Sequence, residues 1–237
     1  MADEKGYRWG RIFVGVQVCG LVVVALVLQS LFAARIGPIE VTAPLKEFMQ
    51  GVFDLDRVGA FGHSFGGQNA AVAMTMDDRI VAGLNMDGTS TYQPIMDDGV
   101  TGSFAFVYDE FEPPYEYLEE DGITVDEWWV DWSVRNFPQA VRDNAKRLEV
   151  FQVEGLKHEG FGTDLTLLKP LVPFVITDDM VGTVDGHELL ILLTDVIDAF
   201  FDRELSGADD GRLDDVVKRH DALHRGIDGH PDFVDAE

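Results

Sequence analysis

The clearest structural signal in the sequence is a ten-residue segment that reads Val58-Gly59-Ala60-Phe61-Gly62-His63-Ser64-Phe65-Gly66-Gly67. It starts as a short apolar strand and leads into residues 66–76, which are rich in small side chains and compatible with a helix. A G-x-S-x-G pattern between a strand and a helix is typical of a nucleophile elbow. Such a turn strains the serine backbone, and we expect Gly62 and Gly66 there because side chains would collide with neighbouring backbone.

Further along the chain, apolar runs with strand character alternate with segments of helical pattern. The predicted strands are 58–61, 80–86, 103–108 and 148–153, and the predicted helices are 45–53, 66–76, 128–147 and a final one that opens at Asp185. Glu188 completes a capping box with Asp185, and apolar pairs as far as Phe200 and Phe201 keep one stripe facing a core. This alternation predicts an α/β fold with a mostly parallel sheet and crossover helices, and ligand sites in such sheets lie at the carboxyl ends of the strands.

A nucleophilic Ser64 needs a general base and an acid that orients it, and in this fold they follow in the order serine, acid, histidine. His158 lies between Gly155 and Gly160, just after a predicted strand, where it could approach the serine. We expect His63 to point away from the nucleophile. The other histidines lie in the first turn of the last helix or in the acidic tail; they are His187, His220, His224 and His230.

Two aspartates are candidates for the orienting acid. Asp87 ends the predicted strand 80–86, and Asp109 ends the predicted strand 103–108. Both lie at carboxyl strand ends, so the residues alone leave the two alternatives open.

Three segments resemble the platelet-activating-factor acetylhydrolases, a family of α/β-hydrolases. The elbow is similar, and residues 84–88, Leu-Asn-Met-Asp-Gly, resemble the strand end that carries the family's acid. Residues 155–161, Gly-Leu-Lys-His-Glu-Gly-Phe, resemble the motif that carries its histidine. The resemblance extends over about residues 55–205.

This resemblance implies an α/β-hydrolase fold with a Ser64, Asp87 and His158 triad, and it favours Asp87 over Asp109 as the acid. It implies a carboxylic ester hydrolase that acts on short or oxidised acyl chains of phospholipids, without a metal or an organic cofactor. The expected partner is therefore a small ester or phospholipid substrate. The backbone N–H of Phe65 should contribute to the oxyanion hole.

The sequence departs from the family before the elbow. Only 63 residues precede Ser64, and none of them resembles the family's glycine-containing oxyanion loop. We therefore expect a fold truncated at its N-terminal side; losing one oxyanion donor typically costs about a hundred- to thousandfold in rate. One alternative is a catalytically impaired, membrane-anchored remnant or binding protein. Another is a relative of polyester or dienelactone hydrolases, with Asp109 as the acid.

Residues 12–34 form a charge-free apolar run of 23 residues, long enough to cross a bilayer as a helix. Because Lys5, Arg8 and Arg11 precede it, we expect a membrane anchor with the hydrolase domain outside the cytoplasm. A cleaved signal segment, strands of a hydrolase core, and a secreted or cytoplasmic protein are the alternatives. The expected organisation is an apolar segment and linker over 1–37, a hydrolase domain over 38–207 and an acidic surface tail over 208–237.

The composition narrows the possible partners. With 43 acidic and 18 basic residues, the formal net charge is −25, which excludes nucleic acid and disfavours anionic lipid surfaces. Such a charge also suits a protein that remains soluble in high salt. Cys19 is the single cysteine, so an internal disulfide is excluded. The sequence does not specify an oligomeric state, and a tryptophan group over 128–132 is expected to pack in the core or line an acyl pocket.

Overall fold

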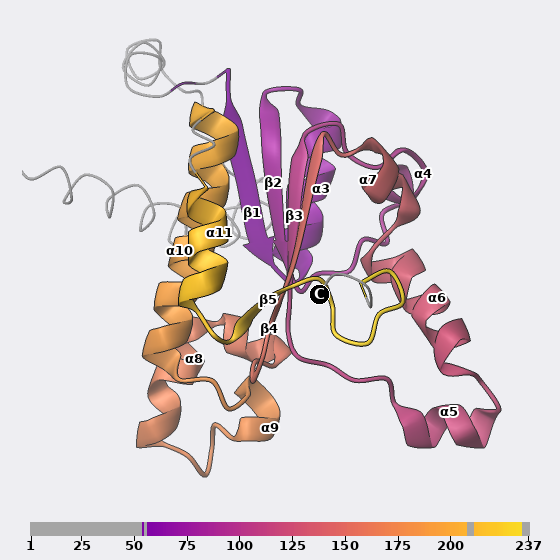
Figure 1. The fold of residues 1–237 in the computed structure, drawn as a ribbon, viewed down its shortest axis with the longest axis vertical. Helices are drawn as coiled ribbons and strands as arrows, with labels where there is room; N and C mark the ends of the chain where they lie inside the picture. Colours follow the sequence, from indigo (N-terminus) through magenta and orange to yellow (C-terminus); the bar gives the residue numbers. More distant parts are fainter. Residues whose placement is uncertain (1–53, 55, 208–210, 234–237) are drawn as a thin grey trace, which may run out of the picture. The chain divides into compact units, whose positions relative to one another are not determined.

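A computed structural model describes residues 54, 56–207 and 211–233 of the chain. The chain divides into two compact units, 1–55 and 56–237, and the account that follows concerns the second unit (Figure 1). The apolar run 12–34 and the predicted helix 45–53 lie outside the described residues. Among the helices of the described part, none has the length and apolar character needed to cross a membrane.

A five-stranded sheet forms the centre of the domain. Its strands run in the order of the chain: β1 (Val58–His63), β2 (Ile80–Met86), β3 (Ser103–Tyr108), β4 (Arg147–Val153) and β5 (Leu223–Arg225). The first four are parallel, and β5 is antiparallel to β4. The predicted mostly parallel α/β sheet is therefore confirmed, with an additional antiparallel strand.

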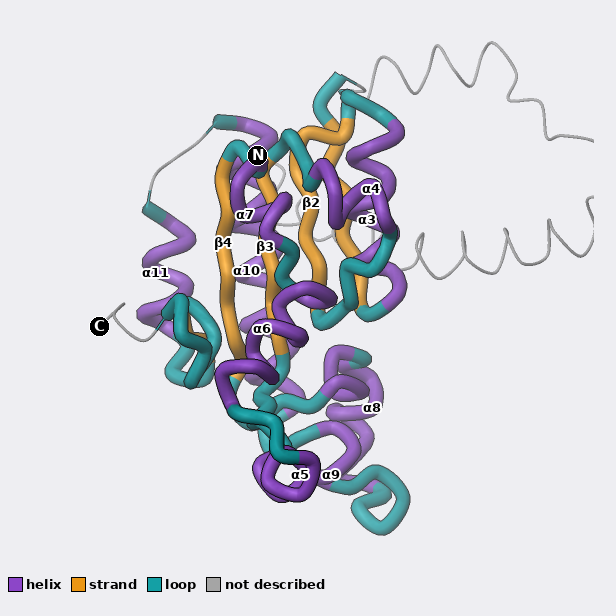
Figure 2. Tube along the Cα trace, turned by 90° about the vertical axis from the view of Figure 1, so that its right-hand side faces the viewer, coloured by secondary structure: helices purple, strands orange, loops and turns teal. Residues whose placement is uncertain are grey.

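Helices cover both faces of the sheet, as Figures 1 and 2 show. One face carries α3 (Phe65–Met76), α4 (Gln93–Asp98), α6 (Val125–Asn136) and α7 (Gln139–Asn144). The other carries α10 (Gly186–Ser206) and α11 (Arg212–Arg219). Beyond the carboxyl ends of the strands lie α5 (Tyr115–Asp121), the 3-10 helices η1 (His158–Phe161) and η2 (Lys169–Leu171), α8 (Thr163–Leu168) and α9 (Asp178–Val181).

The helix predicted over 128–147 is in fact two helices, because a proline interrupts it. Pro138 directly precedes α7, and the fixed proline φ and missing N–H end one helix while starting the next. The capping box at the start of α6, between Thr124 and Glu127, fixes the other boundary.

Strand β3 shows how the sheet separates two hydrophobic cores. Phe104, Phe106 and Tyr108 point to the face with α3 and α6, whereas Ala105 and Val107 point to the face with α10. All six residues of β3 are buried, because alternate side chains of a parallel strand face a helix layer on each side. This explains why the strand reads as a continuous apolar run in the sequence.

The expectation of an acidic surface tail over 208–237 is corrected for its described part, residues 211–233. In α11, Leu213 and Val216 are buried one turn apart, while the acidic side chains occupy the opposite face. Strand β5 pairs with β4, and His230 is only 1% exposed. The segment has few apolar residues but buries them in the two cores, with Leu213, Val216 and Leu223 in one and Ile227 in the other, so the domain continues past residue 207.

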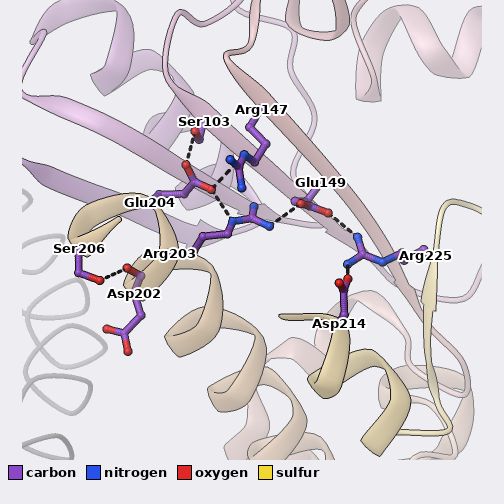
Figure 3. A network of polar contacts seen from close by, with 9 residues as sticks. All are labelled: Ser103, Arg147, Glu149, Asp202, Arg203, Glu204, Ser206, Asp214 and Arg225. Carbon is purple, nitrogen blue, oxygen red and sulfur yellow. Dashed lines mark hydrogen bonds and ion pairs between the residues drawn. The ribbon is translucent and has the colours of Figure 1, made fainter. Parts of the chain in front are cut away.

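An ion-pair network links helix α10 to the sheet at the end opposite the strand carboxyl ends (Figure 3). Arg203 of α10 binds Glu149 of β4 at 2.8 Å and its neighbour Glu204 at 2.6 Å. Glu149 also binds Arg225 of β5 at 2.5 Å, and Glu204 accepts a hydrogen bond from Ser103 of β3 at 2.5 Å. The network therefore joins α10 to three strands.

Replacing Glu149 with Ala should lower the free energy of unfolding by about 3 kcal/mol, because the buried Arg203 would lose one of its two carboxylate partners. Urea denaturation followed by circular dichroism measures this change. Asp215→Ala is the matched control: its pair with Lys218 is solvent-exposed, so the loss should stay below about 1 kcal/mol. Equal effects of the two substitutions would contradict a structural role for the network.

Candidate active site

The turn from β1 to α3 holds Ser64 in a conformation that few side chains adopt. Its φ is 56° and its ψ is −124°. Apart from glycines, the described residues have positive φ only at Ser64 and Asp87. The Ser64 N–H donates to the Met86 carbonyl at 2.8 Å, and its carbonyl accepts from the Gly67 N–H at 2.9 Å. Hydrogen bonds on both sides of the turn therefore keep Ser64 in this strained conformation.

The two glycines of the elbow differ in why they are needed. A Cβ at Gly62 would lie 2.5–2.9 Å from the backbone of Gly66, so no side chain fits there. A Cβ at Gly66 would meet nothing within 4 Å among the described residues, so the expected collision at Gly66 is wrong. The crowding arises because the helix backbone at 66 passes close over the strand at 62.

The structure brings Ser64, His158 and Asp87 together. The Ser64 hydroxyl lies 3.0 Å from His158 Nε2, and His158 Nδ1 lies 2.5 Å from Asp87 Oδ2. A carboxylate oxygen only accepts, so Nδ1 carries the proton and Nε2 is free to accept from the serine. The three side chains come from the ends of β1 and β2 and from η1 after β4, so they meet at the carboxyl edge of the sheet.

Asn85 shapes the turn that presents Asp87. It is fully buried, its Nδ2 donates to the Gly88 carbonyl and its Oδ1 accepts from the Gly88 N–H, both at 2.8 Å. A Cβ at Gly88 would lie 2.1 Å from the Ser64 carbonyl, so the two turns touch. Sequence reasoning missed this role of Asn85; the available signal was an amide within an otherwise apolar strand.

Glu110 holds the loop that carries His158. Its carboxylate accepts from the Gly155 N–H at 2.7 Å, and its carbonyl accepts from Lys157 Nζ at 2.6 Å. The Glu110 N–H donates in turn to the Leu156 carbonyl at 3.0 Å. The loop after β4 is thereby fixed to the end of β3, a contact that the sequence analysis did not anticipate.

Charges around His158 favour its protonated form. The hydrogen bond to Asp87 raises the pKa of His158, and the charges of Asp87, Glu159 and Asp109 add to it, whereas burial lowers it. Asp109, the alternative acid, ends β3 near this group. Burial, followed by the negative charge of Asp87, raises the pKa of Asp109 to about 7. It is the Asp87 carboxylate that bonds the Nδ1 atom of His158.

The Phe65 N–H is the first of helix α3, so it has no acceptor within the helix. The helix dipole also favours negative charge at this point. The Phe65 side chain is 70% exposed next to the nucleophile. Of the residues before β1, the structure describes Asp54, Asp56 and Arg57. The rest of the stretch that could supply an oxyanion loop lies outside the described residues.

The side chain of His63 does not bond to Ser64, and its ring packs against His158 and Phe161. The tryptophans belong to an aromatic cluster under α6: Trp129 is 2% exposed and contacts Trp128, Trp132 and the buried His230. The packing interpretation of these tryptophans thus fits the structure.

No group of three or more potential metal ligands occurs in the described part of the chain. His220 lies 2.9 Å from Asp195, whereas His224 lies 3.3 Å from Glu154, so the two side chains pair with different carboxylates.

Comparison with protein-family models and with curated proteins gives no match. Among solved structures, the chain is similar to a ferulic acid esterase from Streptomyces cinnamoneus, with a TM-score of 0.54 and 22% sequence identity. The similarity covers 73% of this chain and 47% of the esterase, so the chain spans about half the length of that protein. This likeness shows a shared α/β fold.

Substituting Ala for Gly62 should destabilise the domain by about 1–3 kcal/mol, because the added Cβ would force the helix backbone off the strand. Gly66→Ala, the matched control in the same motif, should be neutral or stabilise α3 by up to about 1 kcal/mol. Urea denaturation of both variants measures the difference. A destabilised Gly66→Ala with an unchanged Gly62→Ala would contradict the geometry of this turn.

Proposed function

We propose that this protein is a serine hydrolase that cleaves carboxylic esters through an acyl-enzyme. The observation that carries this proposal is the unbroken hydrogen-bonded chain from Ser64 through His158 to Asp87, at 3.0 and 2.5 Å. The strained turn at Ser64 and the free N–H of Phe65 beside it add support. The fold shared with a ferulic acid esterase is compatible with the same class of reaction.

In the proposed reaction, the Ser64 oxygen attacks the ester carbonyl carbon as His158 Nε2 takes the hydroxyl proton. Negative charge develops on the carbonyl oxygen, where the Phe65 N–H and the α3 dipole stabilise it. The tetrahedral intermediate collapses, and His158 returns the proton to the departing alcohol oxygen. Water, deprotonated by His158, then attacks the acyl-enzyme, and the acid product leaves as Ser64 regains its proton.

Asp87 holds the imidazole tautomer that this cycle requires and stabilises its charged form. Its backbone is locked by the Asn85–Gly88 turn, so the carboxylate is held in a fixed position. The proposed acid is therefore Asp87, with Asp109 the alternative.

As substrates we propose short-acyl esters, including phospholipid esters of the type that platelet-activating-factor acetylhydrolases cleave. Apolar side chains are exposed on the segment that follows His158: Leu168, Leu171, Phe174, Val175 and Met180. Helices α8 and α9 of this segment pack directly against η1. An apolar surface next to the base suits an acyl chain. Esters of ferulic acid, an aromatic acid, belong in the same substrate panel because of the similar esterase structure.

A non-catalytic remnant or binding protein is the competing proposal. It rests on the sequence before the elbow, where no segment resembles an oxyanion loop. In that case the triad would be preserved without turnover. Attachment to a membrane through residues 12–34, with the domain outside the cytoplasm, is likewise proposed from the sequence, and fractionation with protease protection tests it.

A fluorophosphonate probe should label the purified full chain at Ser64, because the probe reacts with a serine activated by a base. Labelling is measured by gel fluorescence in low and high salt, followed by hydrolysis of short-acyl, phospholipid and feruloyl esters. Ser64→Ala should abolish the signal. A folded protein that takes no label would refute the esterase proposal, and labelling without hydrolysis of any ester would favour the remnant.

Asp87→Asn should reduce the labelling rate roughly a thousandfold or more, because the imidazole loses its orienting acceptor. Asp109→Asn should change it less than about tenfold, since Asp109 acts on His158 through its charge and a contact with the His158 backbone, not through the Nδ1 atom. If Asp87→Asn lowers the labelling rate only slightly and Asp109→Asn lowers it strongly, Asp109 is the acid.

The rate of labelling should also depend on pH. The base must be neutral to act, and Asp87 raises the pKa of His158 above its ordinary 6.5. Labelling should therefore fall as the pH drops through that raised value, and Asp87→Asn should move the fall to lower pH. Rates measured between pH 5 and 9 (a range of about two units on either side of neutrality) test the direction. If the labelling rate of Asp87→Asn falls at the same pH as that of the wild type, Asp87 does not act on His158.

A further inference from the structure

His63 connects the elbow to the base. It is the last residue of β1, directly before the nucleophile, and its ring lies beneath η1. The centroid of the His63 ring is 4.6 Å from that of His158, with the planes tilted by 46°. It is 5.3 Å from that of Phe161, with the rings stacked at 26°. One imidazole therefore contacts two side chains of the same short helix.

The backbone geometry of both elements produces this contact. In a 3-10 helix, side chains three residues apart eclipse one another, so His158 and Phe161 project from the same side of η1. Along β1, Phe61 and His63 point to the same face of the sheet, and Phe61 packs against Phe201 of α10. His63 therefore emerges on the α10 face, where η1 is seated.

The burial of His63 is unfavourable for a polar ring. Its Nε2 atom is buried and has no hydrogen-bond partner among the described residues. An unpaired buried polar atom typically costs about 1–3 kcal/mol. Burial also lowers the pKa of His63, and the neighbouring His158 lowers it further, against smaller opposing effects of Asp87 and Glu159. The ring is thus kept neutral beside the base.

We propose that His63 is a positioning residue for His158: its neutral ring fixes the plane of the base between Asp87 and Ser64 and keeps water from the inner face of that ring. This inference rests on the proposed serine hydrolase function. The contact is through the ring face, so an apolar aromatic side chain should replace it, and a side chain without a ring should not.

The charged groups around His158 and its burial decide whether its pKa rises or falls when the His63 ring is removed. Asp87 at the end of β2, Asp109 at the end of β3 and Glu159 on η1 all raise the pKa of His158, and burial lowers it. On the neighbouring α9, Asp178 is paired with Lys169. Removing the His63 ring admits water, which solvates the charged form of His158 and raises its pKa. The neutral base then becomes available only at higher pH.

The experiment is an NMR titration of His158 in the full chain, with isotope-labelled histidine and the signal assigned by its absence in His158→Gln. His63→Ala should raise the pKa of His158 by about 0.5–1 unit and slow fluorophosphonate labelling at neutral pH at least about tenfold. His63→Phe should keep the titration and the labelling rate within about threefold of the wild type, because the ring contact is retained. His224→Ala, an exposed site far from the base in the sequence, is the control and should change neither readout.

An unchanged titration and labelling rate in a folded His63→Ala protein would overturn the proposal, as would equal losses in the Ala and Phe variants. If His63→Ala does not fold, His63→Gln takes its place, with the same expected shift. The NMR titration of His158 can be measured even if the protein has no catalytic activity. A wild-type protein that neither labels nor hydrolyses esters, but whose His158 still responds to His63→Ala, would refute the proposed function and leave the positioning role intact.

Discussion

The arrangement of the whole site depends on the close approach of two tight turns, one at Ser64 and one at Asp87. Each turn holds a non-glycine residue at positive φ, a conformation that survives only where its surroundings impose it. The surroundings are shared: Gly88 lies against the Ser64 carbonyl, and the Asn85 side chain fills the space between Gly67 and Gly88. Ser64 and Asp87 are thus positioned by one packed unit.

His158 belongs to a different part of the domain, and hydrogen bonds from Glu110 hold its loop in place. Glu110 fixes that loop to the end of β3, and the rings of His63 and Phe161 lie against each other on the sheet face. In this way, residues at the ends of β1 and β3 contribute to the position of the His158 imidazole, which lies after β4. The sheet order β1-β2-β3-β4 places their carboxyl ends side by side, so the connections remain short.

The fold and the candidate site could be predicted from the sequence to different extents. Strand and helix alternation predicted the parallel sheet, and local patterns pointed to Ser64 and His158. They left Asp87 and Asp109 open as the acid, and only the family resemblance favoured Asp87. The contacts of Asn85, Glu110 and His63 were missed, since each joins segments far apart in the chain or depends on a backbone turn. The segment 211–233 looked like a tail because its composition is acidic, although its few apolar residues are buried in the two cores.

The order of the strands has a consequence for biosynthesis. Because β1 to β5 follow one another across the sheet as they do along the chain, each strand emerges from the ribosome next to the strand that it pairs with. The parallel part of the sheet, β1 to β4, can therefore grow by adding each new strand to the one made before it, whereas β5 pairs with β4 only after the intervening helices have been made. Helix α10 and strand β5 follow β4 along the chain, and they bring the partners that neutralise Glu149. Until both have been synthesised, the Glu149 carboxylate lacks these partners, so the ion pairs that fix α10 to the sheet form only after β5 has been made.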